Sequence, residues 1–199
     1  MSGRGSRGAP LIVGLGGSTR AGSSTERAVR LAPDAAREAG AETQMFGGLF
    51  LSALPIYGVG TTVHTPEQCL LIDVVRRCDG IIVGSPGYHG SISGMIKNAL
   101  DTLEVLSREN PAYLDGRAFG SIVTAHGGQA CGTTQVALRA IAHALRAWPT
   151  PLGVTLNAIE PLFDAEGACL NENAAAQLKL LADQVVGFAC NTVSTRRVV

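Results

Sequence analysis

The chain contains two apolar segments, each followed by a short polar stretch that opens a helix. The first reads Leu11-Ile12-Val13-Gly14-Leu15-Gly16-Gly17-Ser18-Thr19-Arg20-Ala21-Gly22-Ser23-Ser24-Thr25, and the second reads Gly80-Ile81-Ile82-Val83-Gly84-Ser85-Pro86-Gly87-Tyr88-His89-Gly90-Ser91-Ile92-Ser93-Gly94. Continuous apolar runs of this length are typical of strands that are buried on both faces. The polar stretch after the first run has the makings of a phosphate cradle, and the one after the other run has those of a cradle for a flat ring. Together they predict one phosphorylated aromatic ligand at the ends of two neighbouring parallel strands.

Length and composition indicate one globular domain. The chain has 199 residues, 46% of them hydrophobic, which is enough to build a sizeable core. We expect a disordered N-terminal tail over residues 1–9, a single domain over 10–192 and a C-terminal tail over 193–199. Residues 1–10 lack the apolar segment of a secretory signal, and no apolar run reaches the ~18 residues that span a bilayer. The sequence therefore predicts a cytoplasmic protein without a membrane partner.

Charge and cysteine usage narrow the classes of function. Lys plus Arg equals Asp plus Glu at 16 each, so the chain carries no electrostatic footprint for nucleic acid. The five cysteines are odd in number, and no pair is spaced as Cys-x-x-Cys. A disulfide framework or a zinc site is therefore not expected, and reduced, mostly buried thiols are the better interpretation.

Strand-like and helix-like segments alternate along the whole chain. The strands are expected at 11–15, 42–46, 80–84, 119–124 and 152–156, and the helices at 23–39, 66–77, 93–106, 136–147 and 171–189. Pro33 should kink or interrupt the first helix, and residues 47–65 show no clear period and read as a long loop. This pattern predicts a three-layer α/β/α sandwich with a five-stranded parallel sheet in the flavodoxin-like order 2-1-3-4-5. Its ligand crevice would lie at the carboxyl ends of strands 1 and 3, where the two polar stretches begin.

The first polar stretch offers several kinds of phosphate donor. A helix that starts near Ser23 supplies free N–H groups and the positive end of its dipole, and Ser23 and Glu26 could form a capping box. Hydroxyl groups come from Ser18, Ser23, Ser24 and Thr25, and Arg20 adds a fork-shaped cationic donor. Two other nucleotide signatures fail. Thr19 stands where the dinucleotide motif GxGxxG needs its third glycine, and the Gly-Lys-Ser/Thr of a Walker loop is absent.

The second polar stretch contains residues that fix unusual backbone conformations. Pro86 sets its own φ and restricts the residue before it, and glycines at 87 and 90 permit close approach. Such a loop can present backbone N–H and C=O groups to the polar edge of a ring, and Tyr88 could lie near the ring's face or edge.

This second stretch also carries a specific resemblance. Ser85-Pro86-x-Tyr88-x-Gly90-Ser91-x-Ser93-Gly94-x-x-Lys97-Asn98-x-Leu100-Asp101 resembles the signature of the NADPH-dependent FMN reductase family, and Gly17-Ser18-x-Arg20-x-x-Ser23 resembles that family's phosphate loop. The resemblance runs from about Leu11 to about Ala189. It implies a flavodoxin-like fold, non-covalently bound FMN, hydride transfer from NADPH or NADH, and a homodimer or homotetramer.

The same resemblance implies roles for individual residues. The FMN phosphate would be held by Ser18, Arg20, Ser23, Ser24 and Thr25. The isoalloxazine would be lined by Pro86, Gly87, Tyr88 and His89, with Ser91 supporting that loop, whereas Lys97 and Asn98 would serve helix packing and subunit contact. No residue is assigned as catalytic, because the flavin carries the chemistry while the protein orients it.

A third loop, following the fourth predicted strand, completes the candidate site. Gly127 and Gly128 suit an edge-on approach to the same ring, and the family has a Gly-rich loop here. For His126 two interpretations stay open: a contact to the cofactor, or a loop histidine that makes only structural hydrogen bonds. The family often has a larger residue at position 87, so Gly87 could open the flavin face to a larger acceptor.

Three functions remain in competition at this level. The leading one is an NAD(P)H-dependent FMN reductase that supplies reduced flavin to a partner monooxygenase. A reductase of quinones, azo dyes or chromate with tightly bound FMN would share the same site. A flavodoxin-like electron carrier is less well supported, because such carriers tend to be strongly acidic and this chain is neutral, and a non-enzymatic flavin-binding module is a further alternative. The preference for NADH or NADPH is left open, because neither an acidic nor an arginine-rich recognition site stands out.

Overall fold

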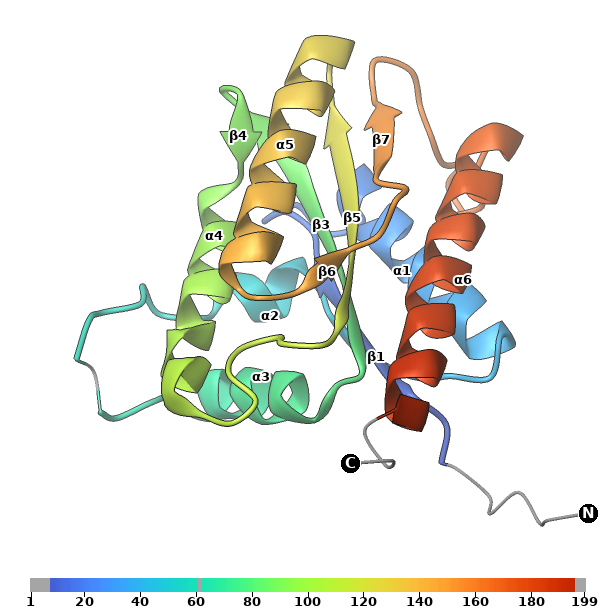
Figure 1. The fold of residues 1–199 in the computed structure, drawn as a ribbon. Helices are drawn as coiled ribbons and strands as arrows, with labels where there is room; N and C mark the ends of the chain where they lie inside the picture. The colour runs from blue at the N-terminus through green and yellow to red at the C-terminus, as the bar shows by residue number, and fades with distance from the viewer. Residues whose placement is uncertain (1–7, 61, 196–199) are drawn as a thin grey trace, which may run out of the picture.

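The computed structural model describes residues 8–60 and 62–195, which form an α/β sandwich (Figure 1). Its parallel strands run roughly upward in Figure 1, so their carboxyl ends lie at the top. The elements are, in chain order, β1 (Leu11–Gly16), α1 (Ser24–Glu38), β2 (Glu42–Phe46), α2 (Gly48–Ser52), α3 (Pro66–Arg77), β3 (Gly80–Tyr88), β4 (Ser91–Ile92), α4 (Gly94–Asp101), the 3₁₀ segment η1 (Thr102–Arg108), β5 (Ala118–Ala125), α5 (Gly128–Ala144), β6 (Trp148–Pro149), β7 (Val154–Asn157) and α6 (Glu172–Thr195).

The sheet confirms the flavodoxin-like class but corrects the predicted strand count and order. Within the described residues it has seven strands, in the order β2-β1-β3-β5-β6, with β4 paired to β3 and β7 paired to β5. The predicted five-stranded 2-1-3-4-5 sheet is therefore wrong in two places. The third strand runs on past the sheet and folds back as the antiparallel β3–β4 hairpin. The last strand is interrupted: β6 pairs with the start of β5 and β7 pairs with its end.

The interruption of the last strand has a chemical cause. Pro149 and Pro151 have no N–H to donate to a ladder, and Thr150 turns its N–H to the carbonyl of Phe119. The chain resumes pairing only at Val154, opposite Ile122. Two short strands thus share one edge of β5, at the position where a single strand was predicted.

Helices cover both faces of the sheet. In Figure 1, α3, α4 and α5 lie on one face, and α1 and α6 lie on the other. Successive strand residues point to opposite faces, so Val13 and Ile81 pack in the first layer while Ile12 and Ile82 pack in the second. Both layers are apolar and buried, which fixes the strand ends, and the loops that follow them, in register.

Glycines at the strand ends let α1 lie close to the sheet. A Cβ on Gly16 would sit 2.7 Å from Val29 Cγ2 and 2.8 Å from the carbonyl oxygen of Gly84, and a Cβ on Gly84 would overlap Val29 as well. Gly14 faces Pro33 in the same way. Pro33 does not interrupt α1, because it lies on the buried face and packs against the space that Gly14 leaves.

Several element boundaries differ from the sequence-based expectation. α5 begins at Gly128 instead of residue 136, and α6 runs to Thr195 instead of 189. The helix expected over 93–106 ends as α4 at Asp101 and continues as η1, and the predicted loop 47–65 contains the short α2. The expected N-terminal tail 1–9 lies outside the described residues up to position 7, and the expected C-terminal tail does so from 196.

Cysteine burial also differs from the expectation. Only Cys78 and Cys131 are buried, whereas Cys69 and Cys190 are exposed, and all five are free thiols. Burial raises the pKa of the Cys78 thiol to about 11. The described helices include none that is long and apolar enough to cross a membrane.

Candidate functional site

The phosphate loop is formed by residues 17–23, between β1 and α1. Gly17 and Gly22 have φ values of 140° and 63°, which a side chain would disfavour. Ser23 is the N-cap of α1, and its buried hydroxyl accepts a hydrogen bond of 3.3 Å from the backbone N–H of Glu26. The loop thus ends at the positive pole of a 15-residue helix, where an anion is favoured.

The charges around this loop favour an anion. Arg20 is exposed, and its guanidinium has no hydrogen bond or ion pair with any residue that the structure describes. Glu26, in the first turn of α1, would repel a phosphate, but it is paired with Arg30 at 2.7 Å and does not complete the predicted capping box. One cationic side chain therefore remains available at the loop, while the nearest carboxylate is neutralised.

The second loop is a tight hairpin held from below. Ser85 is fully buried; its hydroxyl donates to the carbonyl of Pro86 and accepts from the N–H of Ser93 at 2.9 Å. At the tip, His89 and Gly90 have φ values of 51° and 85°, the left-handed pair that two-residue hairpins of type I′ require. This geometry explains why glycine follows the histidine.

The two loops meet in one cleft of about 500 Å³, within the range of small-molecule sites. Its lining comes from the phosphate loop, the second loop and the end of β5: Ser18, Thr19, Arg20, Ser23, Ser24, Thr25, Pro86, Gly87, Tyr88, Thr124, Ala125, His126, Ala130 and Ala158. The cleft lies at the carboxyl ends of β1, β3 and β5, which is where parallel sheets of this kind bind ligands.

A second hollow of about 410 Å³ shares two residues with this cleft. His126 and Ala130 line both, and the second hollow adds Gly90, Gly127 and Gly128 from the hairpin tip and the start of α5. A Cβ on Gly127 or Gly128 would meet nothing within 4 Å, so these glycines border open space. The φ of 120° at Gly127 requires glycine, and its N–H is held at 3.1 Å by the side chain of Asn157.

The structure brings most of the predicted site residues together. Nine of the thirteen line the cleft: Ser18, Arg20, Ser23, Ser24, Thr25, Pro86, Gly87, Tyr88 and His126. Gly127 and Gly128 line the adjoining hollow. His89 and Ser91 lie in the exposed hairpin beyond the cleft, where the carbonyl of Ser91 accepts a hydrogen bond from Thr134.

Gly87 is small for a reason other than the one the sequence suggested. A Cβ there would lie 2.8 Å from Thr134 Oγ1 and 3.1 Å from the Cβ of Ala125. The space beside Gly87 is thus occupied by α5 and β5. A larger residue would press against the chain's own fold, so Gly87 does not by itself open the ring face to a larger acceptor.

Sequence reasoning missed two residues that shape the site. Thr124 lies at the end of β5 and places its hydroxyl 2.5 Å from that of Thr25. Asn157 lies at the end of β7 and holds the Gly127 loop. Neither has a local sequence signal, because each acts across the sheet on a distant loop; only their positions at strand ends could have pointed to them.

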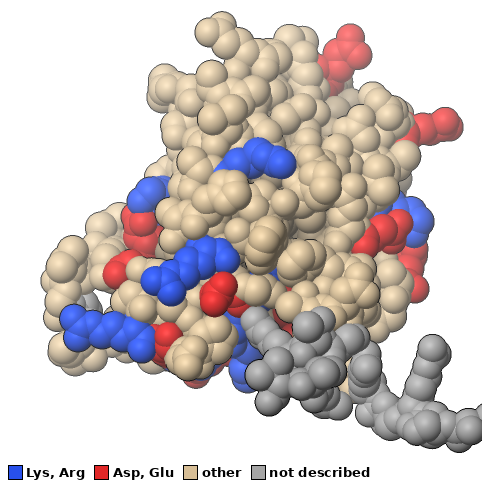
Figure 2. All heavy atoms as spheres, viewed as in Figure 1, with Lys and Arg blue, Asp and Glu red and all other residues tan. Residues whose placement is uncertain are grey.

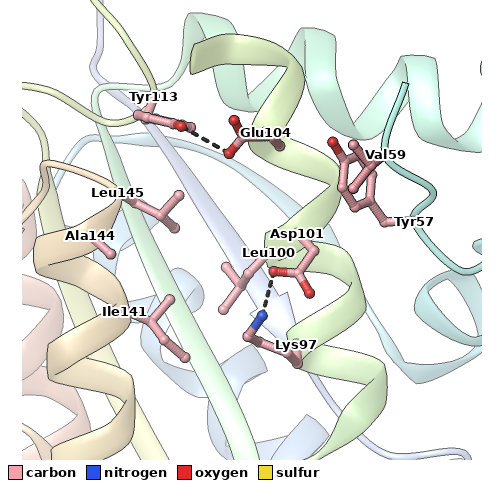
Figure 3. Close-up of a pocket in the computed structure, with 10 residues that line it drawn as sticks. All are labelled: Tyr57, Val59, Lys97, Leu100, Asp101, Glu104, Tyr113, Ile141, Ala144 and Leu145. Atoms are coloured by element: carbon pink, nitrogen blue, oxygen red, sulfur yellow. Dashed lines mark hydrogen bonds and ion pairs between the residues drawn. The ribbon is translucent and has the colours of Figure 1, made fainter. Parts of the chain in front are cut away.

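A third hollow lies away from the strand ends. It measures about 590 Å³ and is lined by residues of α4, α5 and the segment around Tyr57 (Figure 3). Its charged side chains are engaged with neighbours: Lys97 with Asp101 at 2.5 Å, and Glu104 with the hydroxyl of Tyr113 at 2.9 Å. Because its charges are paired and its walls are mainly apolar, this hollow lacks the phosphate-binding character of the cleft.

Surface charge adds no competing site. On the face shown in Figure 2, basic and acidic side chains are interspersed and do not gather into a patch of one sign. The described residues also contain no group of three or more His, Cys, Asp or Glu side chains arranged to hold a metal ion.

Fold and cleft together define a flavodoxin-like protein with a joined phosphate- and ring-binding site, and the comparisons with known proteins agree. A sequence model of the NADPH-dependent FMN reductase family matches residues 10–160, so the chain belongs to that family. The chain is accordingly an NAD(P)H-dependent FMN oxidoreductase that uses FMN with NADPH.

Individual relatives are more distant. The chain is 32% identical over 120 residues to an FMN-dependent NADPH-azoreductase of Staphylococcus saprophyticus, covering 59% of this chain and 60% of that protein. It is 28% identical over 137 residues to an iron-sulfur flavoprotein of Methanocaldococcus jannaschii, covering 65% and 68%. The match to the azoreductase thus leaves more than a third of that protein's length unspanned.

Solved structures support the fold. The flavoenzyme NAD(P)H:(acceptor) oxidoreductase FerB of Paracoccus denitrificans aligns with a TM-score of 0.70 at 21% identity, over 92% of this chain and 97% of FerB. The apo form of an NADH:FMN oxidoreductase aligns with a TM-score of 0.69 at 20% identity, over 92% and 90%. At such identities the likeness concerns the fold alone.

The residues of the cleft fit FMN. A phosphate dianion would meet an unpaired guanidinium, several hydroxyls and a helix N-terminus, which is the donor set that phosphates require. The other end of the cleft has a proline, a tyrosine and open backbone at the β3 and β5 loops, which suits a flat heterocycle with a polar edge. No lining residue of the cleft is acidic.

Proposed function

We propose that the protein is an NAD(P)H-dependent FMN reductase whose reduced flavin is delivered to a small acceptor, a free flavin that then serves a partner monooxygenase. The observation that carries this proposal is the pair of joined hollows at the strand ends. One has the donors for FMN, and the other extends from the same edge into open space beside Gly127 and Gly128. A bound flavin would leave room for a pyridine nucleotide and an acceptor to visit in turn.

The phosphate end is proposed to provide binding energy rather than chemistry. Arg20 would make charge-assisted hydrogen bonds to the phosphate, and Ser18, Ser24 and Thr25 would donate their hydroxyl protons. Ser23 has a different task, because its hydroxyl already accepts from Glu26 N–H and so holds the first turn of α1 in place. FMN, when bound, supplies the hydride acceptor and donor of the reaction.

The ring end is proposed to orient the flavin and to stabilise it when reduced. Pro86, Gly87 and Tyr88 would flank the ring, and Tyr88 is 53% exposed, so its ring can adjust to a visitor. His126 lies where the cleft and the adjoining hollow meet, and its imidazole N–H could donate to the edge of the ring that gains negative charge. His89 and Ser91 would act only indirectly, through the hairpin.

The proposal is tested by steady-state oxidation of NADPH and NADH with free FMN, riboflavin, a quinone and an azo dye as acceptors. A flavin reductase should turn over free flavins with a kcat/KM at least tenfold above that for the dye and the quinone. Comparable or higher values for the azo dye or quinone would overturn the flavin-supply role. Binding of FMN with no oxidation of either nucleotide would indicate an electron carrier or a non-enzymatic flavin-binding protein instead.

A second candidate is an azo or quinone reductase with tightly held FMN. It is favoured by the names of the relatives, FMN-dependent NADPH-azoreductase, and by that of FerB, an NAD(P)H:(acceptor) oxidoreductase. This candidate predicts that FMN stays bound through gel filtration, whereas a flavin-supplying enzyme would lose it. The two roles therefore differ in flavin retention as well as in the acceptor panel.

We also propose that the protein forms a homodimer or homotetramer. The sequence suggested that Ile96 and Leu100 would be exposed, but they are 0% and 2% exposed and belong to the monomer's own core. The exposed apolar residues near the third hollow are instead Ile56 and Val59, at 85% and 95%. Light scattering at micromolar concentration should give a multiple of the 20.5 kDa chain mass, and a mass of one chain would refute the proposal.

A further inference from the structure

Two threonines that lie far apart in sequence meet in the floor of the cleft. Thr25 is in the first turn of α1 and Thr124 is near the end of β5, and their hydroxyl oxygens are 2.5 Å apart. Both side chains are almost fully buried, at 2% and 5% exposure, and both line the cleft. Within the part of the chain that the structure describes, neither hydroxyl has another hydrogen bond.

The contact depends on the missing side chain at Gly84, which lies on the strand between them. A Cβ at Gly84 would be 3.4 Å from the methyl group of Thr25, so that methyl packs over the bare glycine backbone. With the methyl held there, the hydroxyl of Thr25 is directed to β5. A threonine in a helix commonly turns its hydroxyl back to the preceding turn, but Thr25 binds Thr124 instead.

The direction of this hydrogen bond has a chemical consequence. A hydroxyl has one proton to donate and two lone pairs, and the oxygens of a phosphate dianion can only accept. If Thr25 donates its proton to Thr124, Thr25 turns lone pairs to the phosphate and repels it. If Thr124 donates to Thr25, the proton of Thr25 is free for the phosphate, and the chain Thr124 to Thr25 to phosphate is polarised in one direction.

We propose that Thr124 is a positioning residue for the FMN phosphate: it fixes the rotamer of Thr25 and donates to its oxygen, so that the proton of Thr25 is aimed at the phosphate. This inference rests on the proposed binding of FMN in the cleft. It assigns a phosphate-specific role to a residue of β5, on the far side of β3 from the phosphate loop. Through this pair, the end of β5 and the start of α1 act as one preformed surface.

The test compares FMN with riboflavin, which lacks the phosphate, in Thr124→Val and Thr124→Ser. Valine keeps the shape of threonine without the hydroxyl, and serine keeps the hydroxyl. Thr124→Val should weaken FMN binding roughly fivefold, as loss of one net hydrogen bond implies, and change riboflavin binding less than twofold. Thr124→Ser should bind FMN within twofold of the unmodified protein. Dissociation constants come from quenching of flavin fluorescence.

A double-variant cycle adds a further readout. If Thr124 acts through Thr25, the Thr25→Val/Thr124→Val protein should bind FMN no more weakly than Thr25→Val alone. Additive losses would overturn the proposal. So would a Thr124→Val protein that loses FMN and riboflavin affinity in equal proportion, or loses neither, because a merely structural threonine would behave in that way.

The outcomes separate this inference from the proposed function. If the unmodified protein does not bind FMN more tightly than riboflavin, the assignment of the phosphate loop fails. If it does, and Thr124→Val keeps the same preference, only the positioning role fails. Should Thr124→Val not fold, as judged by circular dichroism, Thr124→Ala replaces it. That variant must lose the FMN preference that Thr124→Ser retains, or the proposal is overturned.

Discussion

Substituting Gly16 by alanine tests whether α1 is held against the strand ends as tightly as the structure indicates. The new Cβ would lie 2.7 Å from Val29 Cγ2 and 2.8 Å from the carbonyl oxygen of Gly84. Gly16 and Gly84 are register partners in the β1–β3 ladder, so that oxygen cannot move without breaking strand pairing. Restoring ordinary contact of about 3.4 Å to Val29 requires α1 to move outward by about 0.7 Å.

The cost of this displacement follows in two parts. Overpacking a well-packed core destabilises by about 1–3 kcal/mol, which lowers Tm by roughly 2–12 °C for a chain of this size. A shift of about 0.7 Å also stretches a hydrogen bond of about 2.9 Å to the phosphate beyond the range of good geometry. Losing one charge-assisted bond of about 1.5 kcal/mol weakens FMN affinity by roughly tenfold.

The assay is thermal unfolding followed by circular dichroism, together with FMN titration by fluorescence quenching. Gly94→Ala is the matched control, because a Cβ there meets nothing within 4 Å and its φ lies outside the left-handed region. Gly16→Ala should lower both Tm and FMN affinity, and Gly94→Ala should lower neither. A Gly16→Ala protein with the Tm and FMN affinity of the control would refute the idea that α1 is held in close contact here.

Three further predictions concern other parts of the molecule. Arg20→Ala should weaken FMN affinity by about 1–3 kcal/mol and leave riboflavin affinity nearly unchanged in the same titration, because its guanidinium serves the phosphate alone; an equal loss in the exposed control Arg108→Ala would contradict this. Asn98→Ala should lower the free energy of unfolding in urea by about 1–3 kcal/mol and speed hydrogen exchange at Tyr57, because the buried amide accepts from Tyr57 N–H at 2.8 Å and donates to the Pro55 carbonyl at 3.0 Å, whereas Lys97→Ala should cost about 1 kcal/mol or less because its ion pair is exposed. At pH 8 iodoacetamide should modify Cys69 well before Cys78 by mass spectrometry, and since the unfolded Cys78 thiol ionises near pH 9.0 but the folded one near 11, its linkage lowers folding stability as pH rises from 9 to 11; equal labelling rates would refute the burial of Cys78.

The sequence was sufficient for the class of fold because the signals there are local. Continuous apolar runs at β1, β3 and β5 mark buried strands, and polar loops after β1 and β3 mark the ligand edge. The start of α5 was missed because its N-cap is Gly127, which makes no side-chain cap, and glycine-rich sequence reads as loop. The split of the last strand was missed because pairing with β5 is decided by prolines that also suit an ordinary loop.

The candidate site was predictable where one segment alone builds it. Ser18, Arg20 and Ser23 follow from the loop's own composition. The threonine pair did not follow, because Thr25 and Thr124 are 99 residues apart and meet only through the order of the strands. Gly87 was misread for the same reason: the atoms that require a glycine there belong to β5 and α5.

The central claim is that the cleft at the strand ends binds FMN, by its phosphate and its ring, in a form that NADPH can reduce. It is tested most directly by the visible absorption spectrum of the purified protein titrated with FMN, followed by NADPH under anaerobic conditions. The account predicts saturable changes in the flavin bands with FMN, weaker changes with riboflavin, and bleaching near 450 nm (roughly, the band of oxidised flavins) when NADPH is added. Spectra that remain the sum of protein and free FMN, with no bleaching by NADPH, would contradict it.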